Sequence, residues 1–139
     1  MYNKLKRFFD RHNFYYQEDV TDEGQKLFRL QQSIAGSETL GIVLVFDEKE
    51  TVLDIIVFNI ATVSDHGKYE ELLKIINELN AKYKFWKFIA SKDGKVRAEY
   101  NLVVESELSC KAVILPIELL VCWMNENGLH KSLMRLQWS

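Results

Sequence analysis

The residues best suited to catalysis or metal binding in this sequence are its three histidines and two cysteines. His12, His66 and His130 are far apart along the chain, and none has another histidine or cysteine three or four positions away, the spacing typical of zinc ligands. Cys110 and Cys122 lack the CxxC spacing of redox and zinc motifs. The sequence therefore predicts neither a metal site nor a catalytic cysteine.

The motifs for phosphate binding and acyl transfer are incomplete as well. Two Gly-Lys pairs, at 67–68 and 94–95, resemble the end of a phosphate-binding loop, but both lack the earlier glycine and the following Ser or Thr. Ser64, Asp65 and His66 are consecutive in one short segment, where they suit a helix cap better than a catalytic triad. We expect no enzymatic activity and no cofactor.

Composition excludes further classes of function. The chain has 139 residues, of which 47% are hydrophobic, so a single domain over 1–139 can bury a sizeable core. Its 18 basic and 20 acidic residues give a net charge of -2, which is not the basic surface of a nucleic-acid-binding protein.

Targeting signals are also absent from the pattern. The basic start of the chain is not followed by the apolar run of a signal peptide. The longest apolar stretch, 112–124, contains Pro116 and Glu118 and is shorter than the roughly 20 residues that cross a bilayer. With two cysteines and no disulfide framework, these features predict a cytoplasmic protein that does not enter a membrane.

Hydrophobic periodicity predicts the elements that would position any site. A period of 3.6 indicates helices over 2–13, from Ser64 or Asp65 to 84, 111–127 and 129–136. Strand-like segments are 26–34, 40–46, 51–60, 85–91 and 95–105. The acidic segment at 18–23 is predicted to be an exposed loop. Pro116 lies either in the first turn of its helix or at a kink.

These segments predict an α+β fold with helices segregated from a five-stranded antiparallel sheet. The order is α-β-β-β-α-β-β-α, with the short 129–136 helix at the end. The connections at 35–37 and 47–50 are too short for parallel crossovers and suit hairpins. At Asp93 and Gly94 a tight turn joins the last two strands.

The two middle strands carry apolar side chains on both sides. Besides a first apolar face, strand 40–46 has Val43 and Val45, and strand 51–60 has Leu53, Ile55 and Val57. Exposing these five side chains would forgo about 1.5–3 kcal/mol each. Either helices therefore lie on both faces of the sheet, or a homodimer or client protein packs on a partner interface formed by these residues.

The helix at 111–127 is apolar almost all round. Its narrow polar strip consists of Glu118, Cys122 and Asn125, so the helix is either central to the fold or shared with a partner. A second hypothesis is a small-ligand pocket between the sheet and this helix, using Glu118 and Cys122.

Four segments carry a family resemblance: Asn-Glu-Leu-Asn-Ala at 77–81, the strand 83–89, Asp-Gly-Lys-Val at 93–96 and Tyr-Asn-Leu at 100–102. With the predicted element order, they resemble the YbjN family of bacterial proteins over most of the chain. The resemblance implies the fold of type III secretion chaperones and a role as a sensory transduction regulator. It implies no catalytic residue.

The leading hypothesis is a non-enzymatic protein-interaction or regulatory module, acting as a homodimer or on a protein partner. The alternatives are a small-ligand binding domain, and an immunity-type protein that inhibits one cognate partner.

Overall fold

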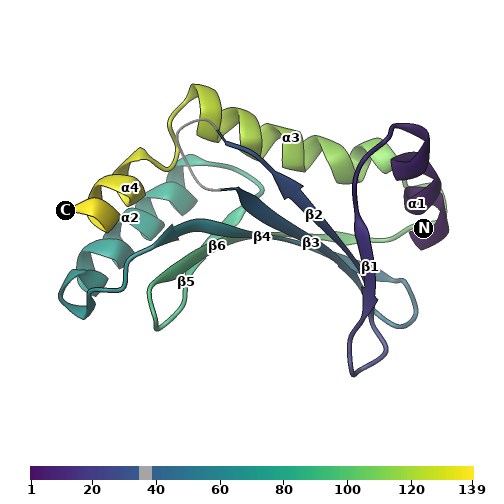
Figure 1. Ribbon diagram of the computed structural model, residues 1–139, viewed down its shortest axis with the longest axis horizontal. Helices are drawn as coiled ribbons and strands as arrows, with labels where there is room; N and C mark the ends of the chain where they lie inside the picture. Colours follow the sequence, from purple (N-terminus) through teal and green to yellow (C-terminus); the bar gives the residue numbers. More distant parts are fainter. Residues whose placement is uncertain (35–38) are drawn as a thin grey trace.

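The computed structural model describes residues 1–34 and 39–139, so the predicted connection at 35–37 lies outside the described residues. Within these ranges, four α-helices and six strands make up the fold (Figure 1). The elements are α1 (Tyr2–Arg11), β1 (Gln17–Val20), β2 (Lys26–Gln32), β3 (Leu40–Phe46), β4 (Val52–Thr62), the 3-10 turn η1 (His66–Lys68), α2 (Tyr69–Lys82), β5 (Lys87–Ala90), β6 (Lys95–Val103), α3 (Cys110–Glu126) and α4 (Lys131–Trp138).

The strands form one antiparallel sheet in the order β1-β2-β3-β4-β6-β5. The α+β prediction is confirmed, but the prediction of five strands is wrong because β1 is a sixth. Its four side chains are all exposed, so it has no apolar alternation. It is a strand because it pairs with β2 through a turn that contains Gly24 at φ +83. The predicted acidic loop therefore begins only after Val20.

One face of the sheet holds the hydrophobic core. Alternate side chains of β3 and β4 point into it, among them Leu44 and Ile55, which are opposite each other and fully buried. In Figure 1, α1 and α3 lie above this face. We call it the helix-covered face; its helices contribute Phe9, Leu72 and Leu120 to the same core.

The opposite face has no helix of its own chain against it within the described residues. In Figure 1, no helix lies in the space below β2 and β3. Val43, Val45 and Ile56 point to this side and are only half-buried. The alternative in which helices cover both faces is therefore wrong. We call this side the open face.

The segments that carry the family resemblance build the β5–β6 end of the sheet. Asn80 on α2 uses both ends of its side-chain amide: Oδ1 accepts from Phe88 N at 2.7 Å, and Nδ2 donates to Phe88 O at 3.0 Å. This pairing satisfies one residue of the edge strand β5. Gly94 is at φ +81, and a Cβ there would overlap the carbonyl oxygen of Val63. Asn80 and Gly94 therefore have structural roles: Asn80 pairs with the edge strand β5, and Gly94 allows the β5–β6 turn to pack against Val63.

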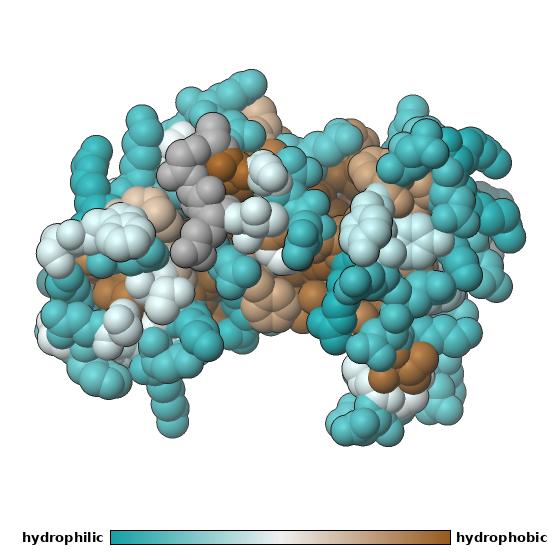
Figure 2. Space-filling model, in the orientation of Figure 1, coloured by the Kyte–Doolittle hydropathy of each residue, from teal (hydrophilic) through white to brown (hydrophobic). Residues whose placement is uncertain are grey.

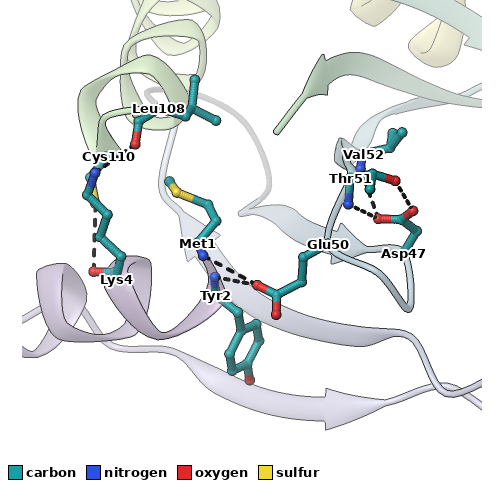
Figure 3. Close-up of polar contacts among 9 residues, drawn as sticks. All are labelled: Met1, Tyr2, Lys4, Asp47, Glu50, Thr51, Val52, Leu108 and Cys110. Carbon is teal, nitrogen blue, oxygen red and sulfur yellow. Dashed lines mark hydrogen bonds and ion pairs between the residues drawn. The ribbon is translucent and has the colours of Figure 1, made fainter. Parts of the chain in front are cut away.

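Helix α1 is attached at its start to the β3–β4 turn (Figure 3). Glu50 Oε1 accepts a hydrogen bond from Tyr2 N at 2.8 Å, which lowers the pKa of this carboxyl group and satisfies a free N–H at the helix N-terminus. Lys4 Nζ donates to Leu108 O at 2.8 Å, just before α3. The two contacts fix α1 between the turn and α3.

Helix α3 begins with Ser109 as its cap, because Ser109 Oγ accepts from Ala112 N at 3.2 Å. Pro116 lies inside the helix and not in its first turn. Trp86 Nε1 donates to Pro116 O at 2.9 Å and so joins the helix to the β5 side of the sheet. Within the described residues no single helix is both long and apolar enough to cross a membrane, although α3 and α4, bent by 60°, reach that length and composition as a pair.

Candidate functional site

The five residues predicted to form one partner interface lie on both faces of the sheet. Val43 and Val45 are on the open face, whereas Leu53, Ile55 and Val57 are on the helix-covered face and at most 1% exposed. The expectation that the five share one surface is therefore wrong. The register is the cause, because it pairs Val43 with Ile56 and not with Ile55.

The centre of the open face is apolar. Val43 and Ile56 are opposite each other, and Gly41 is opposite Phe58, so these side chains form successive rows across β3 and β4. Phe58 is 39% exposed. We define the apolar centre by its larger side chains: Val43, Val45, Ile56 and Phe58, with Leu27 beside them on β2, where it is only 5% exposed.

Charged groups surround this centre on the outer strands, and Asp54 on β4, opposite Val45, lies at one end of it and accepts a hydrogen bond from Asn101. Arg29 on β2 pairs with Asp19 on β1 at 3.2 Å. On the other side, Glu99 on β6 pairs with Arg97 at 3.1 Å and with Lys87 at 3.8 Å. An apolar centre within a polar rim is the usual anatomy of a protein–protein interface.

A notch interrupts the open face at Gly41. A hollow of about 450 Å³ lies beside this glycine, and its walls include Arg29, Val43, Phe58 and Tyr15. Gly41 has no unusual backbone conformation, and an added Cβ would be 3.8 Å from Phe58 Cβ. The notch is therefore a feature of the surface that the strand does not need in order to fold.

A second hollow lies between the sheet and α3, at the place proposed from the sequence. Its volume is about 600 Å³, and Glu118 and Cys122 are among its lining residues. Figure 2 shows apolar side chains gathered in the hollowed middle of the surface. We call this second hollow the α3 pocket; its apolar lining is Phe14, Tyr15, Leu30, Ile42, Ile114, Ile117 and Val121.

The segment after α1 forms one side of this pocket. Asn13 adopts φ +58, which turns the chain, and Phe14 N donates to Phe9 O at 2.9 Å. Tyr16 Oη then donates to Asp10 Oδ1 at 2.6 Å. Between these two fixed points Tyr15 is 78% exposed and lines both the pocket and the notch.

The Cys122 thiol is held in its protonated form. Its Sγ donates to Glu126 Oε2 at 3.3 Å, and this hydrogen bond to a carboxylate raises the pKa of the thiol. Because the thiolate is the nucleophilic form, this environment suits an uncharged lining group better than a catalytic one.

The histidines are not brought together. His12 stacks on Phe8 with ring centroids 4.2 Å apart, His66 is in η1, and His130 is buried at the start of α4. The described residues contain no group of three or more His, Cys, Asp or Glu that could hold a metal ion.

The fold and these surfaces define an α+β protein whose antiparallel sheet has helices on one face and an apolar centre on the other. A family model matches residues 2–128, and its description is "YbjN: Putative bacterial sensory transduction regulator". The chain belongs to the YbjN family, as the sequence resemblance predicted. A comparison with curated proteins found no match.

The sequence analysis missed Ile56, Phe58, Gly41 and Tyr15. Ile56 and Phe58 alternate with Leu53, Ile55 and Val57 and so belong to the first apolar face predicted for this strand; the β3–β4 register is the signal that places them on the open face. Gly41 and Tyr15 carry no recognisable motif.

Proposed function

We propose that this protein is a non-enzymatic regulatory module that forms a homodimer through its open face. The observation that carries the proposal is the self-complementary arrangement of that face about a line between β3 and β4. A coarse regulatory role agrees with the family description.

The self-complementarity follows from the ladder. One row of residues crosses the open face in the order Gln17, Arg29, Val43, Ile56, Glu99, Lys87. Consider a twofold axis that runs along the strands, between β3 and β4. Rotation about it places Val43 of one copy over Ile56 of the second copy, and Ile56 over Val43. The same rotation places Arg29 opposite Glu99. Closed dimers with one self-complementary patch are the commonest protein assemblies.

The next row adds a steric match. Gly41 and Phe58 are opposite each other, so the same rotation brings the Phe58 ring of a second copy over the Gly41 notch. The strands of two sheets that pack face to face cross at about 30°. This rotation displaces the contacts between the two copies only slightly where they lie near the axis. The notch is therefore a receptor for the exposed aromatic ring.

The finer parts of the proposal follow from the family resemblance and the cysteines. The one-sided antiparallel sheet supports the fold of type III secretion chaperones and one domain over 1–139. The free thiols Cys110 and Cys122 support a reducing, cytoplasmic environment.

Charge reversal tests the dimer. Arg29→Glu and Glu99→Arg should each weaken association by about tenfold or less. Because twofold symmetry makes the contact between Arg29 and Glu99 occur twice, each variant changes two contacts. The double variant should recover it. Mass measurements by light scattering across micromolar concentrations report the dissociation constant.

Each single variant breaks the in-chain ion pairs of one residue and the double variant breaks both sets, so recovery of association in the double variant reports the contact between copies. Lys74→Glu, an exposed charge reversal on α2, is the matched control. A wild-type protein that stays monomeric at these concentrations contradicts the dimer, and a different protein partner would then be the occupant of the open face.

A second function is favoured by the α3 pocket. Its volume of about 600 Å³ lies within the range of small-molecule sites, and it contains the two polar residues that the sequence singled out. We propose that this pocket binds a small ligand, separately from the open face.

A further inference from the structure

The α3 pocket has an asymmetric distribution of charge. Among the described residues that line it, Glu118 is the one ionisable carboxyl group, and there is no Lys or Arg. The nearest base in the adjoining notch is Arg29, whose guanidinium is paired with Asp19 at 3.2 Å. A cationic group at the mouth of the pocket therefore meets an opposite charge and no like charge in the lining.

The aromatic ring at the mouth favours the same charge. Tyr15 is 78% exposed and lines the pocket, so its face is available to a cation. Contacts between a cation and an aromatic face contribute about 0.5–1 kcal/mol at exposed sites. The carboxylate and the ring together select a positive head group.

The interior of the pocket is aliphatic. Ile114, Ile117 and Val121 on α3 face Leu30 and Ile42 on the sheet, and all except Ile42 are only half-buried. Covering their remaining surface would contribute roughly 25 cal/mol per Å² of apolar area. The interior therefore suits a hydrocarbon chain.

We propose that the α3 pocket binds a cationic amphiphile, with the hydrocarbon chain beneath α3 and the positive head group between Glu118 and Tyr15. This inference rests on the second proposed function, that the pocket binds a small ligand. It is independent of the dimer.

Calorimetric titration with three probes of equal chain length tests whether the pocket binds a small ligand and whether it prefers a cationic head group. Decylammonium, decyl maltoside and decanoate, each below its micelle concentration, should bind in that order of affinity. Glu118→Gln should weaken decylammonium binding about two- to fivefold and leave the other two probes unchanged or tighter. Glu70→Gln, an exposed carboxylate on α2 outside the lining, is the matched control.

Val121→Phe, which narrows the pocket, should weaken all three probes. If circular dichroism shows that this variant does not fold, Thr39→Trp narrows the pocket from the exposed opposite side.

The outcomes separate the two claims. Failure of every probe to bind the wild-type protein overturns the pocket function itself. Equal or tighter binding of decanoate, or an equal loss with Glu70→Gln, overturns the choice of a cation while the pocket function stands.

Discussion

The two faces of the sheet use the same kinds of residues for different purposes. On the helix-covered face, Leu44 and Ile55 are fully buried by the chain's own helices. On the open face, the neighbouring pair Val43 and Ile56 stays half-buried, inside a rim of paired charges. Strand composition alone therefore does not distinguish a buried face of the sheet from an open one; the presence or absence of covering helices does.

This comparison locates stability and association in different residues. Removal of a side chain from the helix-covered face leaves a cavity in a closed core. Removal of a side chain from the open face leaves no such cavity, and in the proposed dimer it changes the contact surface.

The largest expected effect is on folding. Ile55→Ala should lower the free energy of unfolding by about 2–5 kcal/mol, whereas Val43→Ala should lower it by about 1 kcal/mol or less. Urea denaturation at concentrations where the protein is monomeric measures both. Similar losses for the two variants would mean that the faces do not differ as described.

The next effect concerns the clamp on the edge strand. Asn80→Ala should cost about 1–3 kcal/mol, because both backbone groups of Phe88 lose their partner. Asn77→Ala, an exposed position on the same helix, is the control and should change stability by less than about 0.5 kcal/mol. If Asn80→Ala is equally mild, the family motif has a role other than this clamp.

Filling the notch should separate association from folding. Gly41→Val adds a branched side chain that strands favour, where a Cβ meets only ordinary contacts. Light scattering should show a monomer, and the free energy of unfolding should be unchanged within about 1 kcal/mol. A dimer of unchanged affinity would exclude the Phe58 ring from the notch.

The smallest effect is a dependence on pH. Burial, and less strongly the charge of Lys131, lowers the pKa of His130 below its ordinary 6.5, and its Nδ1 has no partner within the described residues. As the pH falls, His130 therefore binds a proton at a higher pH in the unfolded chain than in the folded protein. The free energy of unfolding should decrease as the pH drops below about 6.5. His130→Gln should flatten this slope, with His66→Gln as the matched substitution; an unchanged slope would contradict the assignment.

Much of the fold could be predicted from the sequence, because helices with a clear apolar stripe and strands joined by short turns are local signals. Strand β3 has its predicted bounds, and the family resemblance is confirmed. Strand β1 could not be predicted, since its exposed residues become a strand only by pairing with β2.

The open face was the harder problem. The turn at Asp47, which accepts hydrogen bonds from Thr51 N and Val52 N, sets the register between β3 and β4. That register pairs odd-numbered positions of one strand with even-numbered positions of the other. A shift of one residue exchanges the faces of a strand, and both sides of these strands are apolar, so the sequence did not reveal which residues share a surface.

The most direct test of the account is whether Val43 is covered in solution. With Cys122→Ser removing the exposed thiol and Cys110 buried, Val43→Cys places one reactive thiol at the centre of the open face. The dimer predicts that its alkylation is slow at micromolar concentrations and accelerates on dilution. A rate that is fast and independent of concentration would contradict the dimer.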